Sequence, residues 1–362
     1  MKSNLVDNYS WKRADFERAK SPGSKNYSQY AILEESWWEQ RQWGVTIAID
    51  TLANANHPLA DTLKAEVANL QPLVPSRAGY KPAKPEDVFH CGGTEISFDA
   101  TGAIDHLSYG GVAWADAKHT LAQLKYRSYS AKDVGEFFSQ YCKSNAGWVQ
   151  HDYGKPGLPS DVLGKIWTTT MKGLWVKQGP EESSNCSFIA QTAFDPEASS
   201  EYGAAAGWTT VEVQGSGKLA VEVGMFNKST TRIPEAMFMQ FQPTGAGKWS
   251  ADKLGEWVAE DEIVPGGSQH LQGVMEGGLR YDLGDHPAKR TQIGAATHSM
   301  QIGSTDAGLA NFGELTAYPS PVNTSADTKT YGASFVLFDN LWGTNCALRF
   351  LCLPACLRWH PL

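Results

Sequence analysis

Beyond Pro85 the sequence consists of short runs with β-strand character, separated by glycine, asparagine, aspartate and proline. Residues 94–98 alternate in polarity, the turn-forming residues 99–102 follow, and a second short run covers 103–107. This order predicts a strand, a turn and a second strand that pair as a hairpin. Many short strands joined by turn signals favour a mainly β architecture built from large packed sheets.

Two other regions strengthen the prediction of a β architecture. Residues 208–213 and 219–223 flank the glycine-containing segment 214–217. This arrangement predicts a second hairpin with a Gly-rich loop. Residues 334–338 predict a further strand, because they form a short apolar run of strand length.

Two parts of the sequence predict helices instead. Between residues 26 and 73, apolar residues recur at spacings of three, four and seven, which is typical of two or three amphipathic helices. A stretch rich in proline and glycine follows, and we place the boundary to the β-rich part near Pro85. Within that part, residues 130–141 predict one helix, with Ser130 as N-cap and Asp133 completing a capping box.

Charge and composition restrict the kinds of partner. The chain has 31 basic and 39 acidic residues and a formal net charge of −8. Nucleic acids and anionic membranes bind clustered lysine and arginine, so we expect neither as a partner. Thirteen tryptophans provide flat apolar rings, which suit stacking against a neutral partner such as a carbohydrate.

The sequence leaves the cellular compartment open. Six cysteines are too few and too scattered for a disulfide framework, and no paired spacing indicates a zinc site. The first residues do not resemble a signal peptide, and no apolar run approaches the ~20 residues of a membrane-spanning helix. Five Asn-x-Ser sequons would be glycosylated only in a secretory setting. They begin at Asn8, Asn26, Asn185, Asn227 and Asn323.

Five segments together resemble a family of poorly characterised proteins, called domain of unknown function 5054, that is related to family 38 glycoside hydrolases. These segments are ESWWEQR (35–41), YRSYS (126–130), WVQHDYGKPG (148–157), TRIPEA (231–236) and DNLWGTN (339–345). They are unlike one another and extend over nearly the whole chain. The chain is thus similar to the part of an α-mannosidase-like enzyme that follows its catalytic barrel.

The resemblance implies a helical bundle in residues 1–84 and a large mutarotase-like β-sandwich, a supersandwich, in residues 85–345. In family 38 enzymes the Asp nucleophile and a zinc ion lie in the preceding barrel, with a His-x-Asp pair among the ligands. None of the nine histidines here has Asp two positions later. No catalytic or zinc-binding role is therefore carried over, and no cofactor is expected in this chain. Residues 346–362 look unrelated to the family and form an atypical tail.

The segment 148–157 contains the first group of carbohydrate-binding candidates, which we expect on a loop. They are Trp148, His151, Asp152 and Tyr153. Aromatic rings stack on sugars and carboxylates accept hydrogen bonds from hydroxyl groups. Alternatively, His151 and Asp152 only hold a turn between strands.

A second group surrounds Glu235, which precedes the apolar run 236–241. If that run is a central strand, Glu235 lies at its mouth, where a carboxylate can act as a general base or hold a sugar hydroxyl. His270 or His151 could supply the acid that a mutarotase also needs. The alternative is structural, with either an ion pair between Arg232 and Glu235 or a buried charge that satisfies backbone groups.

A third group follows the predicted strand 335–338 and includes Asn340, Trp342 and Asn345. Loops at the ends of sandwich strands commonly carry binding residues, and amides with an indole face suit a neutral polyol. The same asparagines could instead cap a tight turn, with Trp342 in the core.

Taken together, these features predict the C-terminal portion of a carbohydrate-active, glycoside-hydrolase-like protein, which supports carbohydrate binding and is not catalytic alone. Its expected partners are carbohydrate and the missing barrel, against which Trp37 and Trp38 would pack. Two alternatives remain open, a stand-alone carbohydrate-binding module and a mutarotase-like sugar isomerase.

Overall fold

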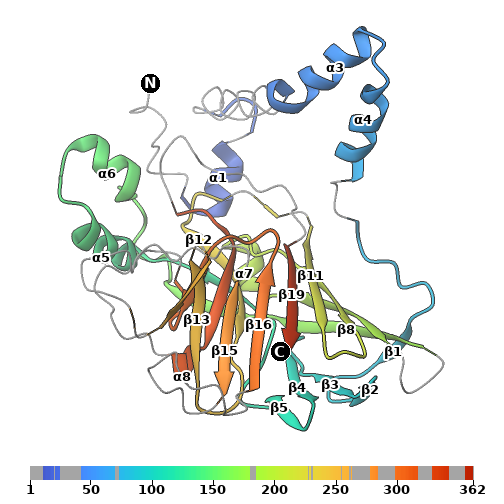
Figure 1. Ribbon diagram of the computed structural model, residues 1–362. Coiled ribbons are helices and arrows are strands. Elements are labelled where there is room, and N and C mark those ends of the chain that lie inside the picture. Colours follow the sequence, from blue (N-terminus) through green and yellow to red (C-terminus); the bar gives the residue numbers. More distant parts are fainter. Residues whose placement is uncertain are drawn as a thin grey trace.

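The structure is a computed structural model of the chain, and Figure 1 shows its arrangement. It describes residues 11–19, 21–24, 42–69, 73–179, 185–226, 228–229, 231–253, 255–260, 262, 278–283, 298–316, 328–341 and 355–361. Within these ranges the chain is mainly β, with few helices. This confirms the predicted fold class at that level.

Three sheets contain the described strands. The ten-stranded sheet has the order β1 (Lys81–Ala83), β8 (Thr170–Gln178), β9 (Cys186–Ala193), β10 (Gly207–Val213), β11 (Leu219–Met225), β19 (Ala355–Pro361), β16 (His298–Ser304), β15 (Leu279–Leu283), β13 (Gly247–Lys253) and β14 (Glu256–Ala259). The five-stranded sheet has the order β17 (Ala310–Phe312), β18 (Ala333–Asp339), β12 (Glu235–Phe241), β6 (Gln123–Ser128) and β7 (Lys165–Thr168). The four-stranded sheet contains β2 (Phe89–Cys91), β3 (Thr94–Phe98), β4 (Ile104–Tyr109) and β5 (Val112–Ala115). Buried residues from all three sheets share one hydrophobic core.

The described helices are short, and none of them is long and apolar enough to cross a membrane. They are α1 (Arg13–Ala19), the π-helix η2 (Gln42–Thr46), α3 (Ile47–Asn54), α4 (Leu59–Asn69), α5 (Ala131–Tyr141), α6 (Gly147–Tyr153), α7 (Pro196–Ser200) and α8 (Thr328–Tyr331). η2, α3 and α4 agree with the helices predicted between residues 26 and 73, whose first part, 26–41, lies outside the described residues, whereas α1 precedes that region and was not predicted. The first strand begins at Lys81. The division into separate domains stays a prediction.

Both predicted hairpins are confirmed. β3 and β4 pair antiparallel, and Asp99 holds the turn between them. Its Oδ1 accepts hydrogen bonds from the backbone N–H groups of Thr101 (2.8 Å) and Ala103 (3.0 Å). β10 and β11 form the second hairpin, and the strand predicted at 334–338 is present as β18.

The helix predicted at residues 130–141 is confirmed as α5, including its capping box. The Ser130 hydroxyl accepts a hydrogen bond from the N–H of Asp133 at 3.2 Å, and the Asp133 carboxylate accepts one from the N–H of Ser130 at 2.7 Å. These two bonds satisfy donors that the first helical turn leaves free.

The expectation that Trp148, His151 and Asp152 lie on a loop is wrong. Their backbone forms helix α6, which ends at Tyr153. Ala146 occupies the N-cap position and makes no side-chain cap. A two-turn helix without a capping side chain carries too short an apolar pattern to be distinguished from a loop.

β12 is the central strand of the five-stranded sheet, as the apolar run after Glu235 suggested. All seven of its residues are buried. Because both faces of the strand are covered, five of its seven residues are apolar and do not alternate with polar ones. Phe238, which is 0% exposed, contributes about 2–3 kcal/mol through burial alone.

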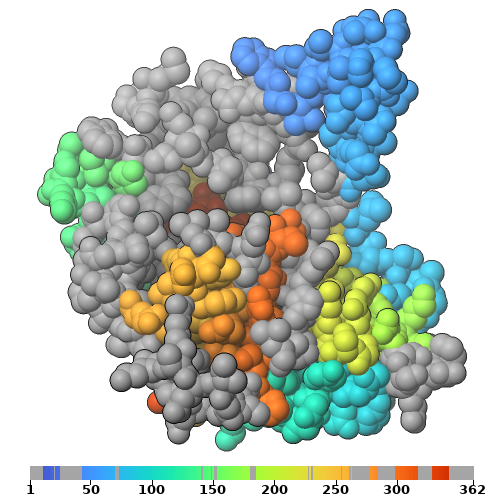
Figure 2. Space-filling view, in the orientation of Figure 1, coloured from blue at the N-terminus to red at the C-terminus, as the bar shows by residue number. Residues whose placement is uncertain are grey.

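α3 and α4 lie apart from the sheets, at one end of the molecule (Figures 1 and 2). Apolar side chains of this end face solvent, with Trp43 73%, Leu59 53% and Leu63 39% exposed. Helices of soluble proteins normally bury such an apolar stripe against a core. This end of the chain therefore presents an uncovered apolar surface.

The segment expected to be an atypical tail contributes one strand to the largest sheet. β19 pairs antiparallel with β11 on one side and with β16 on the other. In this sheet it joins β1 and β8–β11 on one side to β13–β16 on the other.

Candidate functional site

Four of the segments that carry the family resemblance meet near one end of the strands of the five-stranded sheet. β6 ends, β12 begins and β18 ends there, because β12 is antiparallel to both neighbours. Tyr126, Glu235 and Asp339 stand on these three strands. Lys155, just after α6, interacts electrostatically with Asp339.

Glu235 is the centre of a buried cluster with Tyr126, Lys228 and Arg13, which we call the Glu235 network. Lys228 Nζ donates to Glu235 Oε1 at 2.7 Å, and the Tyr126 hydroxyl donates to Oε2 at 2.5 Å. The Glu235 side chain is only 4% exposed. Arg13 donates to the hydroxyl of Ser229, next to Lys228, at 2.6 Å. Both carboxylate oxygens of Glu235 therefore accept hydrogen bonds from within the protein.

Burial controls the protonation of this network. It raises the pKa of Glu235, against the opposing effects of Lys228, Tyr126 and Arg13. Burial and the adjacent Glu235 carboxylate also raise the pKa of Tyr126 well above its usual value. The phenol therefore stays protonated and remains a donor. A carboxylate held in this way is suited to anchoring strands, whereas a general base must reach the proton that it abstracts.

Lys155 forms a second buried charged group beside Asp339. It is only 8% exposed, and its backbone has a φ of 45°, unusual for a residue other than glycine. Burial, together with the nearby Arg232, lowers the pKa of Lys155 to about 8, while Asp339 opposes that shift. Burial in turn raises the pKa of Asp339. The three segments HDYGKPG, TRIPEA and DNLWGTN are thus electrostatically coupled.

Of the two structural alternatives for Glu235, the ion pair with Arg232 is not formed. The Arg232 guanidinium lies over the Trp11 ring, 4.3 Å from its centroid, and Lys228 is the cation beside Glu235. Lys228 stands seven residues before Glu235 in the sequence, and a turn between them brings the two side chains together. The short spacing of Arg232 and Glu235 does not reveal this turn.

Asn340 connects two of the resemblance segments. Its side-chain Nδ2 donates to the carbonyl oxygen of Thr231 at 2.7 Å. Its backbone N–H donates to the backbone carbonyl oxygen of Glu235 at 2.8 Å. These bonds fasten the end of β18 to the start of β12. Tyr153 packs, partly buried, against the hydrophobic core.

The other sequence candidates lie outside the described residues, as side chains or entirely, and stay predictions: Trp148, His151, Asp152, His270, Trp342 and Asn345. In the part of the chain that the structure describes, no group of three or more His, Cys, Asp or Glu side chains could hold a metal ion.

A second cluster, which we call the tryptophan platform, consists of Trp175, Trp208 and Arg77. The two indole rings are stacked, with centroids 6.1 Å apart and an interplanar angle of 23°. The Arg77 guanidinium lies 4.7 Å from the Trp175 centroid and 6.0 Å from that of Trp208. Both tryptophans are partly exposed, while their strand neighbours are buried, so the platform is on the outer face of the ten-stranded sheet.

Gly173 makes room for the platform. A β-carbon at this position would lie 2.3 Å from the Trp175 ring, so the indole extends over backbone that carries no side chain. Gln191 of β9 is the cross-strand partner of Gly173 on one side and of Trp208 on the other. Directly opposed residues share a face, which places the Gln191 amide beside the tryptophans.

The tryptophan platform was not predicted from the sequence. A partial signal is present, because Trp175 stands between Leu174 and Val176 and alternation turns it away from the core. Alternation within one strand does not reveal which residue faces it across the sheet. The contact between Trp175 and Trp208 depends on β9 lying between their strands.

Among solved structures, the chain is similar to a galactose 1-epimerase from Lactobacillus acidophilus NCFM. The two share 10% sequence identity with a TM-score of 0.31, and the alignment covers 78% of this chain and 94% of the epimerase. A similarity of this size supports no conclusion about fold or activity. No curated protein sequence matches the chain.

Residues 1–242 match the family model described as Domain of unknown function (DUF5054). The match covers 242 of the 362 residues and includes the segments from ESWWEQR to TRIPEA. It confirms the family to which these segments pointed. The chain therefore belongs to the family of domain of unknown function 5054.

Proposed function

We propose that this chain is the carbohydrate-binding, non-catalytic portion of a glycoside-hydrolase-like protein, and that the sugar stacks on the tryptophan platform. The observation that carries the proposal is the stacked, partly exposed pair Trp175 and Trp208 on the outer face of a sheet. The β part then corresponds to the mutarotase-like supersandwich of family 38 glycoside hydrolases, as the sequence segments suggest.

The chemistry of the platform suits a neutral sugar. The C–H faces of a pyranose ring are apolar and pack on indole rings, while the hydroxyl groups at its edge need hydrogen-bonding partners. Arg77 lies over both rings in the free chain, so a stacked sugar takes the place of its guanidinium, which then donates to hydroxyl groups at the sugar's edge. The Gln191 amide provides both a donor and an acceptor. A net charge of −8 for the chain also favours a neutral over an anionic ligand.

The mutarotase-like alternative needs an accessible carboxylate. Glu235, at the start of the central strand, is the candidate. One of its carboxylate oxygens accepts a hydrogen bond from Lys228 and the other accepts one from Tyr126. Breaking either bond in a buried site is costly. This arrangement supports a binding role for the chain over anomer interconversion at Glu235.

We further propose that the exposed apolar end at α3 and α4 contacts a catalytic barrel like that of family 38 enzymes. Trp43, Leu59 and Leu63 are more than one third exposed and lie on this end. Large apolar side chains exposed together at one end of a molecule often mark the site of a partner. Any zinc ion of the intact protein would belong to that barrel.

The proposal is tested by calorimetric titration of the chain with methyl α-mannoside and α-linked mannan, with galactan as a comparison. We expect binding without turnover, and a loss of affinity of at least about tenfold, equal to about 1.4 kcal/mol, in Trp175→Ala and in Trp208→Ala. A matched control is Trp257→Ala, because Trp257 belongs to the same sheet and also carries a guanidinium, that of Arg280, at 4.6 Å.

Unchanged affinity in the double variant Trp175→Ala and Trp208→Ala would refute the platform as the binding site. Equal losses in Trp257→Ala would point to a general effect on the sheet. Interconversion of sugar anomers by the wild-type chain, abolished in Glu235→Gln, would favour the isomerase alternative.

A further inference from the structure

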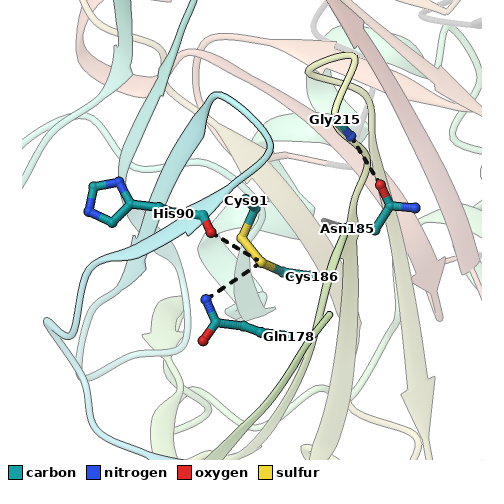
Figure 3. The surroundings of a disulfide bond; sticks show 6 residues. All are labelled: His90, Cys91, Gln178, Asn185, Cys186 and Gly215. Carbon is teal, nitrogen blue, oxygen red and sulfur yellow. Dashed lines mark hydrogen bonds between the residues drawn. A yellow bond between two sulfur atoms is a disulfide. The ribbon is translucent and has the colours of Figure 1, made fainter. Parts of the chain in front are cut away.

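The β8–β9 hairpin combines two features of secretory proteins within three residues. Asn185, Cys186 and Ser187 form an Asn-x-Ser sequon, and the middle residue is part of a disulfide with Cys91. Figure 3 shows the disulfide and, to one side of it, the side chain of Asn185 directed at Gly215. In the sequence alone, the cysteines and the sequons are separate features that leave the compartment open.

The side chain of Asn185 is positioned for modification. Its Oδ1 accepts a hydrogen bond from the backbone N–H of Gly215 at 3.1 Å, so the amide orientation is fixed. The Nδ2 atom, which carries the sugar in an N-linked glycan, points away from Gly215 in Figure 3. Asn185 is exposed, and within the described residues nothing accepts a hydrogen bond from Nδ2. Among the described residues, a glycan on Nδ2 therefore displaces no hydrogen bond.

The disulfide links two sheets. Cys91 belongs to β2 of the four-stranded sheet and Cys186 to β9 of the ten-stranded sheet, with their α-carbons 5.5 Å apart. Both residues are at most 2% exposed. The Cys186 sulfur also lies 3.7 Å from the carbonyl oxygen of His90 and 3.9 Å from the Gln178 amide nitrogen. Because a disulfide sulfur has no proton to donate, the approach to His90 is a packing contact.

We propose that Asn185 is an N-glycosylation site and that the chain acquires its glycan in the oxidising compartment in which the Cys91–Cys186 disulfide forms. In the first step, the Asn185 Nδ2 bonds to the anomeric carbon of an oligosaccharide, loses a proton and displaces a lipid-linked pyrophosphate. In the second, the two thiols lose two electrons and two protons to a disulfide of an oxidoreductase. Such disulfides persist in secretory compartments and are rare in the cytosol.

The fold also sets the order of these events. In the folded chain the hydroxyl group of Ser187 is 2.7 Å from that of Tyr80, and Cys186 is paired with strands on both sides. A glycosyltransferase must reach Asn185 and the Ser187 hydroxyl together. We therefore place glycan transfer before β9 docks in the sheet.

The test uses the full chain expressed behind a secretion leader in eukaryotic cells, with cell lysate and medium pooled. Glycopeptide mass spectrometry reads Asn185 separately from the other sequons, and a digest without reductant maps the disulfide. We expect a glycan at Asn185 in the wild type and in Ser187→Thr, and its complete loss in Ser187→Ala.

Tyr80→Phe is the matched control, because it removes the contact with Ser187 but keeps the sequon, so its glycan should persist. The expected disulfide is present in all of these variants. An unmodified Asn185 in the pooled wild-type protein would overturn the site. Free thiols at Cys91 and Cys186 in the glycosylated chain would overturn the shared compartment.

Discussion

Replacing Lys228 with methionine removes one charge of the Glu235 network and leaves the other buried. The pair is 2.7 Å apart, and its side chains are 16% (Lys228) and 4% (Glu235) exposed. Removing one partner of a buried ion pair costs about 3–5 kcal/mol, because the remaining charge loses its counterion without regaining water. With about 2.1 cal/mol/K of unfolding entropy per residue, the 362 residues give about 1.3 °C per kcal/mol. We therefore expect Lys228→Met to lower the Tm by about 4–7 °C.

The reciprocal variant should be milder. In Glu235→Gln, Lys228 keeps its hydrogen bond to the carbonyl oxygen of Ser229, at 2.8 Å, and its side chain remains partly accessible to water. We expect a loss of about 1–3 kcal/mol. The double variant has neither charge, so it should lose less than the sum of the single variants by at least about 2 kcal/mol. Chemical denaturation of the four proteins at pH 7.5 gives this coupling free energy.

The pH dependence tests the cause. Burial raises the pKa of Glu235 in the folded chain above its ordinary value of 4.5, and loss of Lys228 raises it further. A carboxyl with a raised pKa stabilises the folded state below its unfolded pKa, and this stabilisation is lost as the pH rises through the folded pKa. The deficit of Lys228→Met should therefore shrink between pH 7.5 and pH 5. A constant deficit, or a coupling below about 0.5 kcal/mol, would show that water screens the pair and would refute the reasoning.

Two further predictions concern the other buried groups. Lys155→Met should raise the free energy of unfolding at pH 7 by up to about 3 kcal/mol, because burial lowers the pKa of Lys155 to about 8. The stability that a neutral Lys155 contributes is present above its unfolded pKa and is lost as the pH falls through 8. The stability advantage of the variant should therefore vanish towards pH 10.5. Urea titrations at several pH values measure this, and a variant less stable than the wild type at pH 7 would contradict it. Cys91→Ser removes a cross-link between residues 95 apart, worth about 4.7 kcal/mol in the chain-entropy relation. Thermal denaturation with and without reductant checks this, and an equal effect of reductant on the variant would rule out the disulfide as the cause.

The parts of the fold that the sequence predicted are those fixed by local chemistry. The β3–β4 hairpin depends on Asp99 and the few residues after it, and α5 depends on Ser130 and Asp133, so each pattern lies within one short window. The family also followed from local segments. α6 was missed because its start at Ala146 has no capping side chain.

The features that sequence reasoning missed depend on contacts across the sheets. Glu235 is paired with Lys228 and not Arg232, and the tryptophan platform depends on the register of β8, β9 and β10. The disulfide joins residues 95 apart in the sequence. A periodic pattern shows which face of a strand is buried but not which residue lies opposite.

The five-stranded sheet has a consequence for the order of folding during synthesis. β6 ends at Ser128, β12 begins at Glu235 and β18 begins at Ala333, so the central strand has neighbours that are distant in the sequence on both sides. Long loops of this kind slow folding, since their closure costs entropy before the sheet contacts form. Until β18 has left the ribosome, one edge of β12 stays unpaired and its apolar faces are incompletely covered. Such an edge promotes aggregation, and the nascent chain is thus a natural client for chaperones until this late strand arrives.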